Sequence, residues 1–125
     1  MSQKTISTIG WTLTILLGFL FTMSAWMKIS QDPTAISQAS SMGIDANTYL
    51  IIGIIEIISL ILFIIPRTGI IGSLLLMAYI GGAIATHLQH NEPILLVVVI
   101  EIVIWITAFI RFPELKQRLL PAKIN

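Results

Sequence analysis

Long apolar runs separated by short polar breaks dominate the chain. Four of these runs approach the length that a bilayer demands, about 20 residues for a helix, and they cover residues 6–27, 49–65, 70–87 and 93–110. Polar residues gather between the runs and at the two ends of the chain. The pattern predicts an all-α integral membrane four-helix bundle, in which residues 1–125 form a single transmembrane domain.

The breaks between the runs predict how the chain turns. The second and third runs are separated by "PRTG", where Pro66 should stop one helix and Gly69 should free the backbone to turn. Before the last run, Asn91 is a candidate N-cap and Pro93 a candidate first-turn residue. These short connections predict antiparallel neighbours.

The longest connection covers residues 28–48 and contains the segment "DPTAISQASSMGID". Asp32 can cap a helix there, Pro33 can start it and Gly43 can end it, with Ile36 and Met42 available for its apolar side. We therefore expect a short interfacial helix between the first and second spans.

Composition supports a membrane protein and excludes several kinds of chemistry. Hydrophobic residues make up 56% of the 125 residues and charged residues only 10%, which is far from the balance of soluble domains. Nothing in the chain supports nucleic-acid binding. Because the sequence has no cysteine, disulfides, thiol redox chemistry and cysteine-ligated metals are excluded. The first apolar run lacks a clear cleavage site, which favours a retained span over a signal peptide.

The basic residues predict the orientation of the bundle. Six of them belong to the termini or the second loop, which share one side: Lys4, Arg67, Arg111, Lys116, Arg118 and Lys123. The other side carries Lys28 with three acids, Asp32, Asp45 and Glu92. Under the positive-inside rule both termini should be cytoplasmic, in a bacterial inner membrane. Residues 111–125 are then a basic tail near anionic lipid headgroups.

Small residues recur every fourth position in two of the predicted helices. They are Gly10, Thr14, Gly18 and Thr22 in the first, and Ala78, Gly82 and Thr86 in the third. Because small residues allow close approach of helices in lipid, we predict that these two helices pack deep in the bundle. The fourth helix is rich in β-branched residues and should show most of its surface to lipid, with Glu101 turned inward.

Two carboxylates lie inside the apolar runs and point to a polar pocket. Glu56 and Glu101 should each lie roughly 11 to 12 Å below the outer boundary, at 1.5 Å per residue. An acid at the membrane centre costs on the order of 2.5 to 3.5 kcal/mol, so partners are expected. Lys28 and His87 lie at the outer ends of the first and third helices. One ionisable group from each helix therefore predicts an outward-opening polar pocket.

Three further residues are candidates to line this pocket. Ser59 lies about one turn below Glu56, and Tyr49 lies two turns above it on the same face. Trp26 suits the aromatic belt at the membrane surface and is also placed to roof a pocket.

One other interpretation of the same residues remains open, and a metal site is disfavoured. Lys28, Glu56 and His87 can simply tie the helices together and fix their register, as buried ion pairs often do. A metal site built from His87, Glu56 and Glu101 lacks tight ligand spacing, so we expect no metal.

Several stretches of the chain carry a family resemblance. "SAWMKI", "GIIEIISLILFIIPRTGIIGSLLLMAYIGGAIATHL" and "RFPEL" together resemble the DoxX-like family of small four-helix membrane proteins. The resemblance covers nearly the whole chain. Its most specific residues are Lys28, Gly53 and Glu56, the Pro66–Arg67 turn and His87, whereas Glu101 lies outside the family pattern.

The resemblance implies a small membrane subunit or ligand-binding protein, accessory to a quinone-linked redox system. Some relatives are subunits of a thiosulfate:quinone oxidoreductase, and others belong to oxidative-stress complexes. The chain has no haem, flavin or iron–sulfur signature. We therefore expect a bound quinone or lipid in place of a resident cofactor, a membrane or soluble redox partner, and no enzyme activity of the chain alone. A homo-oligomer stays open.

Other functional classes also fit the pattern. One is a small proton-coupled transporter whose membrane carboxylates exchange protons for substrate. Another is an enzyme acting on a lipid-like substrate, with His87 and Glu56 as an acid–base pair. The last is a structural or assembly protein without a ligand.

Overall fold

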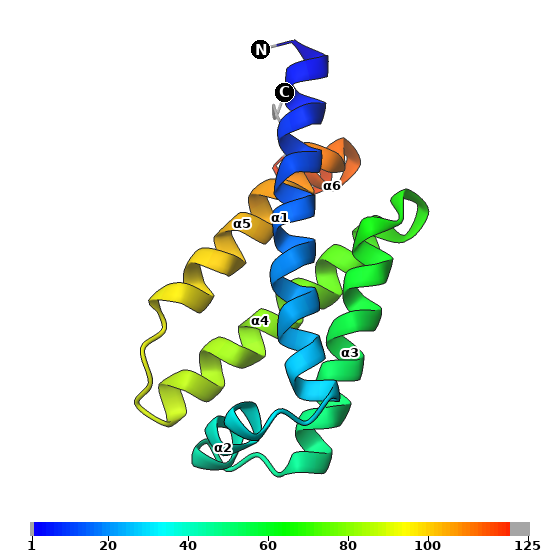
Figure 1. Cartoon of the computed structure of the whole chain (residues 1–125). Helices are drawn as coiled ribbons and strands as arrows, with labels where there is room; N and C mark the ends of the chain where they lie inside the picture. The colour runs from blue at the N-terminus through cyan, green and yellow to red at the C-terminus, as the bar shows by residue number, and fades with distance from the viewer. Residues whose placement is uncertain (1, 121–125) are drawn as a thin grey trace.

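The computed structural model describes residues 2–120, and this part of the chain consists of helices joined by short connections (Figure 1). The helices are α1 (Gln3–Ile29), α2 (Pro33–Ser41), α3 (Ala46–Ile64), α4 (Gly69–Gln89), α5 (Leu95–Arg111) and α6 (Pro113–Leu119), with a single 3-10 turn, η1 (Pro66–Thr68), before α4. Long helices α1, α3, α4 and α5 pack together, which confirms the predicted all-α membrane bundle.

Three helical segments are long and apolar enough to cross a membrane: Gln3–Ile29, Ala46–Ile64 and Pro66–Gln89. The fourth, α5, has 17 residues and meets the same criterion only together with α6, from which it is separated by a bend of 110°. The protein is therefore an integral membrane protein whose described residues contain three candidate spans, or four if α5 and α6 count together as one.

The core lies where one face of each long helix meets the others. Its buried apolar residues include Leu17 and Phe21 of α1, Leu60 and Phe63 of α3, Leu76 and Ile80 of α4, and Ile104 and Ala108 of α5. The opposite faces carry exposed apolar side chains such as Ile15, Phe19, Ile58 and Leu74. A helix that is apolar all round suits contact with both protein and lipid.

Glycines bring the helices very close at the end of the bundle where α3 turns into α4. A Cβ added at Gly72 would overlap the backbone of Phe63, and one added at Gly69 would overlap the ring of Phe112. Gly69 has helical backbone angles, with φ −63°. The prediction that Gly69 frees the turn is therefore wrong, because the absent side chain makes room for Phe112 instead.

The two predicted stripes of small residues differ in how deeply they are buried. On α1, Gly10 and Thr14 are buried, whereas Thr22 is exposed. On α4, Ala78 and Gly82 are exposed, and a Cβ added at Gly82 would meet nothing within 4 Å. The deep packing predicted for this part of α4 is wrong, because no neighbouring side chain fills the space.

Helix α2 forms where the sequence predicts it. The carboxylate of Asp32 accepts hydrogen bonds from the backbone N–H groups of Thr34 and Ala35, at 3.1 and 3.2 Å, and Pro33 is the first helical residue. Gly43 has φ +75°, the left-handed conformation that ends helices.

The connection between α4 and α5 differs from the prediction. Asn91 has φ +57°, and the N–H of Glu92 donates to the carbonyl oxygen of His87 at 2.8 Å. Asn91 thus ends α4, because asparagine tolerates the left-handed conformation. The predicted N-cap is wrong, since α5 begins at Leu95 after Ile94.

The two ends of the bundle differ in charge. The start of α1, the α3–α4 turn and α6 lie at one end, and α2 with the α4–α5 connection lies at the other (Figure 1). The first end carries Lys4, Arg67, Lys116 and Arg118. Lys123 and the rest of the predicted tail beyond residue 120 lie outside the described residues.

Candidate functional site

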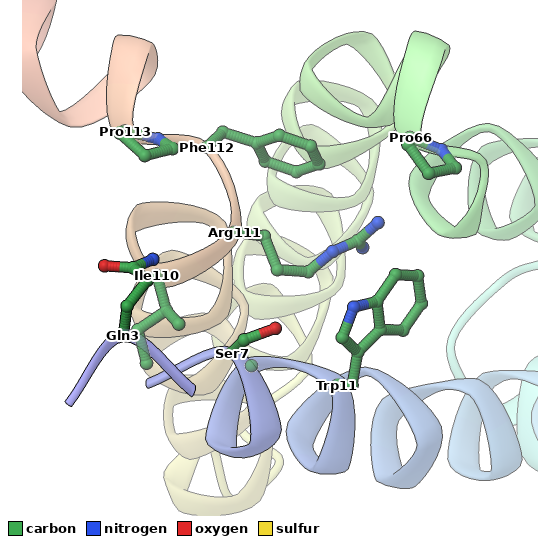
Figure 2. Close-up of a pocket in the computed structure, with 9 residues that line it drawn as sticks. Gln3, Ser7, Trp11, Pro66, Ile110, Arg111, Phe112 and Pro113 are labelled. Atoms are coloured by element: carbon green, nitrogen blue, oxygen red, sulfur yellow. The ribbon is translucent and has the colours of Figure 1, made fainter. Parts of the chain in front are cut away.

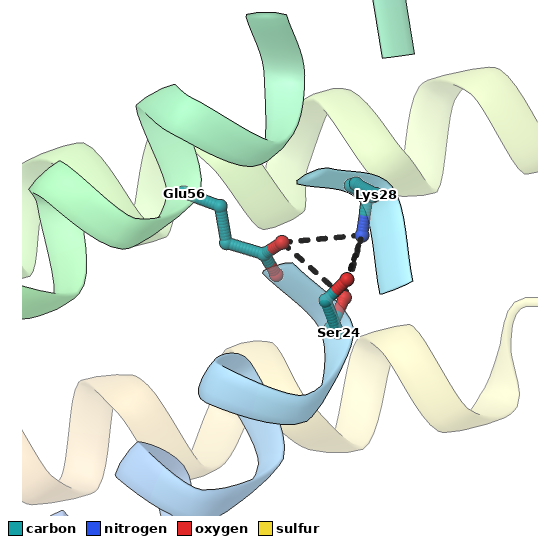
Figure 3. Close-up of polar contacts among 3 residues, drawn as sticks. All are labelled: Ser24, Lys28 and Glu56. Carbon is teal, nitrogen blue, oxygen red and sulfur yellow. Dashed lines mark hydrogen bonds and ion pairs between the residues drawn. The ribbon is translucent and has the colours of Figure 1, made fainter. Parts of the chain in front are cut away.

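A buried ion pair joins α1 to α3. The Nζ atom of Lys28 lies 3.1 Å from Oε1 of Glu56, and the two side chains are 9% and 1% exposed (Figure 3). Ser24, one turn before Lys28, completes the cluster, because its Oγ accepts from the Lys28 ammonium at 2.5 Å and donates to Oε1 of Glu56 at 3.3 Å. The cation and the carboxylate are thus both hydrogen-bonded, as burial of charge requires.

Gly53 sets the geometry of this pair. A Cβ added there would lie 2.7 Å from Cβ of Lys28 and 3.2 Å from Cγ1 of Ile29. Because Gly53 has no side chain, α3 lies against the last turn of α1. Glu56 follows three residues later on the same face of α3, within reach of Lys28.

A cavity of about 440 Å³ lies beside the ion pair. Its walls come from α1, α3, α4 and α5, and Met42 and Ile44 of the α2–α3 connection complete them. Most of the lining is apolar, and the polar side chains that converge on it are Ser24, Lys28, Tyr49, Glu56, Tyr79, Thr86 and His87. We call this cavity the Lys28–Glu56 pocket.

Two tyrosines flank the ammonium group inside this pocket. The Nζ atom of Lys28 lies 5.3 Å from the ring centroid of Tyr49 and 6.0 Å from that of Tyr79, within the range of cation–π attraction. Tyr79 also packs edge-on against Phe21, with ring centroids 6.3 Å apart.

His87 lines the pocket, and a hydrogen bond to the backbone fixes the roles of its two ring nitrogens. Its Nδ1 lies 2.7 Å from the carbonyl oxygen of Ala83. Because a carbonyl oxygen can only accept, Nδ1 must carry the hydrogen and donate it. In the neutral ring Nε2 is then the atom that can accept a hydrogen bond or a proton.

Three of the residues that the sequence placed around the pocket lie elsewhere. Ser59 is buried and donates to the carbonyl oxygen of Ile55 at 2.7 Å. Trp26 is 66% exposed, because it precedes Lys28 by two residues and so points from another face of α1.

Glu101 is the third of these residues. Its neighbour Ile100 lines the pocket, but Glu101 itself does not. One residue turns the side chain by about 100° around a helix, enough to carry it out of the cavity. Oε1 of Glu101 accepts a hydrogen bond from Nε1 of Trp105 at 3.0 Å, while Oε2 is buried without a hydrogen-bond partner in residues 2–120.

Three polar pocket residues, Ser24, Tyr79 and Thr86, were not among the site residues inferred from the sequence, although spacing offered a signal for the first two. Ser24 precedes Lys28 by four residues, and Tyr79 precedes His87 by eight, so each shares a helix face with a residue already singled out. Within the described residues, no group of three or more histidines and acids could hold a metal ion.

Comparison with known proteins assigns the chain to a family. The sequence model of the DoxX-like family matches residues 12–110, a segment that contains every residue lining the pocket. Comparisons with curated proteins and with solved structures return no match. Since the match covers most of the chain, the protein belongs to the DoxX-like family.

Proposed function

We propose that the Lys28–Glu56 pocket binds a small amphiphile of the quinone class, and that the protein is a membrane subunit of a quinone-linked redox system. The observation that carries this proposal is a largely apolar cavity of about 440 Å³ with a buried ion pair in its wall. Small-molecule sites have this size and this mixture of apolar lining and few polar groups.

The polar groups of the pocket suit both redox forms of such a ligand. A quinone carbonyl oxygen accepts hydrogen bonds, and the ammonium group of Lys28 can donate one in place of its 3.4 Å contact to the carbonyl oxygen of Ser24. A quinol hydroxyl donates, and Nε2 of His87 can accept. The hydrogen bonds that Ser24 and Lys28 donate to Glu56 both end on Oε1, so a ligand hydroxyl can donate to Oε2.

Oxidation of a quinol releases two electrons and two protons. In this role a membrane or soluble redox partner takes up the electrons, and the carboxylate of Glu56 and Nε2 of His87, which both line the pocket, accept one proton each. The pocket residues then orient the ring and exchange its protons.

The charges of the two ends support an orientation for this site. With Lys4, Arg67, Lys116 and Arg118 at one end, the positive-inside rule favours an orientation in which this end faces the cytoplasm of a bacterial cell. The Lys28–Glu56 pocket then lies in the outer half of the inner membrane.

A matched pair of glycine variants tests the pocket. A Cβ added at Gly81 or at Gly82 meets nothing within 4 Å, but only Gly82 lines the cavity. Gly82→Leu should therefore fill the pocket without disturbing helix packing, and Gly81→Leu should leave it open. Each protein is purified in detergent, saturated with a short-chain ubiquinone and analysed for retained quinone by mass spectrometry.

The expected result is quinone retained by the wild type and by Gly81→Leu, and lost from Gly82→Leu. Absence of quinone from the wild type contradicts the proposal. Equal retention by Gly82→Leu and Gly81→Leu contradicts the assignment to this cavity.

A proton-coupled transporter is the second candidate, favoured by a buried carboxylate in the wall of a cavity within the membrane. In proteoliposomes, Glu56→Gln should abolish substrate uptake driven by a proton gradient, while Glu101→Gln, whose side chain lies outside the pocket, should not. Normal uptake by a folded Glu56→Gln variant would remove Glu56 from the mechanism.

A further inference from the structure

The guanidinium group of Arg111 lies at the opposite end of the bundle from Lys28. Its Nη1 donates to the carbonyl oxygen of Phe63 at 2.7 Å, and its Nη2 donates to that of Ile64 at 3.1 Å. These bonds use two of the five N–H groups of an arginine. Within residues 2–120 the other three have no hydrogen-bond partner, and no carboxylate lies within 4.0 Å of the guanidinium.

Aromatic rings hold this group in place. The central carbon of the guanidinium lies 4.6 Å from the ring centroid of Trp11, 5.0 Å from that of Phe63 and 4.8 Å from that of Phe112. Stacking of this kind fixes the plane of an arginine and leaves its edge free for hydrogen bonds. The charge is thus positioned without being neutralised by a protein acid among the described residues.

A cavity of about 170 Å³ lies beside Arg111, between the start of α1 and the corner where α5 meets α6 (Figure 2). Gln3 and Ser7 line it together with Arg111 and add an amide and a hydroxyl. The volume is several times the ~30 Å³ that one water occupies in the liquid, so a phosphate group fits.

The cavity lies at the end of the bundle where α5 bends into α6. Arg111 is the last residue of α5, and the chain then bends by 110° into α6. The same end of the bundle carries four further cations, Lys4, Arg67, Lys116 and Arg118. From the cavity, the exposed apolar residues Trp11, Ile15 and Phe19 follow one face of α1 toward the middle of the bundle.

We propose that this cavity binds the phosphodiester group of an anionic phospholipid, with the acyl chains along the Trp11, Ile15 and Phe19 face of α1. A planar guanidinium can bind two oxygens of one phosphate at once, and Gln3 and Ser7 add neutral donors. The apolar face of α1 favours a lipid over a soluble phosphate, because a soluble ion gains nothing from it.

Two variants that change the net charge by the same amount test this site. Ser7→Glu puts a carboxylate into the cavity beside Arg111, whereas Arg67→Gln removes one positive charge from the same end but outside the cavity. The full chain in detergent is titrated with phosphatidylglycerol and observed by native mass spectrometry. Ser7→Glu should weaken binding about tenfold or more, and Arg67→Gln by about twofold at most.

Arg111→Lys supplies an independent measurement, because lysine keeps the charge but lacks the planar fork, and it should also weaken lipid binding. If Arg111→Lys fails to fold, Ser7→Glu still tests the site, because Ser7 is exposed and its replacement should not disturb the fold. Equal affinity of Ser7→Glu and Arg67→Gln for phosphatidylglycerol would overturn the proposal.

Inorganic phosphate serves as the competing ligand. Retention of phosphatidylglycerol in the presence of excess phosphate supports the lipid assignment. The lipid assignment would be overturned in favour of a soluble anion if phosphate displaced the lipid and if Ser7→Glu weakened phosphate binding as much as lipid binding. Neither measurement involves a quinone, so the outcome is independent of the Lys28–Glu56 pocket.

Discussion

The two halves of α4 use glycine in opposite ways. Near its start, Gly69 and Gly72 lie so close to Phe112 and Phe63 that an added Cβ would overlap them. Two turns from its end, Gly81 and Gly82 face open space. The residue type is the same, so the difference comes from the neighbouring segments: the ring of Phe112 and the backbone of α3 fill the space beside Gly69 and Gly72, whereas nothing lies within 4 Å of a Cβ added at Gly81 or Gly82.

The charged side chains at the two ends of the bundle also differ in their partners. At the tightly packed end, Arg111 donates to backbone carbonyl oxygens at the end of α3. At the other end, Lys28 and Glu56 pair with each other in the wall of a cavity. One end of the bundle therefore depends on packing and the other on an ion pair, and substitutions should separate these two sources of stability.

The largest effect is expected from Lys28→Met. This variant leaves the carboxylate of Glu56 buried without its cation, which should lower the free energy of unfolding by about 3 to 5 kcal/mol. Reversible unfolding in mixed detergent micelles measures the change. The double variant Lys28→Met/Glu56→Met should recover much of the loss, since it removes both charges. A loss below about 1 kcal/mol in the single variant would mean that the pair is effectively solvated.

The next effect is expected from Gly72→Ala at the tightly packed end. The new methyl group would meet the backbone of Phe63, which cannot move aside as a side chain can. Overpacking of this kind costs about 1 to 3 kcal/mol. The same unfolding measurement detects this loss of stability. An unchanged unfolding midpoint would show that α3 and α4 can move apart without a loss of stability.

Gly81→Ala should have the opposite effect and stabilise the protein. The added methyl group meets nothing within 4 Å, and alanine favours a helix interior over glycine by about 0.5 to 1 kcal/mol. The free energy of unfolding should rise by up to this amount. A loss of stability would indicate that the space beside Gly81 is filled in the membrane-embedded protein.

The smallest effect concerns Asp45, the N-cap of α3, the helix that carries Glu56. The N–H of Thr48 donates to its carboxylate at 2.7 Å and holds the pKa of Asp45 below its usual value of 3.8. A lowered folded-state pKa stabilises the fold at pH above 3.8, and this contribution is lost as the pH falls through the folded-state pKa. The thermal unfolding midpoints of the wild type and Asp45→Asn should therefore converge at low pH. A difference between the midpoints that stays constant with pH would contradict a stabilising role for the Asp45 carboxylate.

The sequence predicted features that depend on local patterns. Runs of apolar residues marked the helices, and Asp32, Pro33 and Gly43 marked the limits of α2. Lys28 and Glu56 were recognised as partners because membrane charges need compensation.

Predictions from the sequence were wrong or incomplete for two kinds of feature. One depends on how a helix is rotated about its axis, and the other on a contact with a residue far away in the chain. Glu101 lies one residue from a pocket position and still points elsewhere. Gly69 makes room for Phe112, a residue far away in the chain. Arg111 was interpreted only as a charge that fixes orientation, although its partners are carbonyl oxygens of α3.

The contact of Gly53 with Lys28 has a consequence for the biogenesis of the protein. Glu56 entering a bilayer alone costs on the order of 2.5 to 3.5 kcal/mol, and the cation that offsets this cost belongs to α1. The two charges meet only when Gly53 lets α3 lie against the end of α1. We therefore expect the translocation machinery to release α1 and α3 into the lipid as one hairpin, with α2 as its connector, and not one helix at a time.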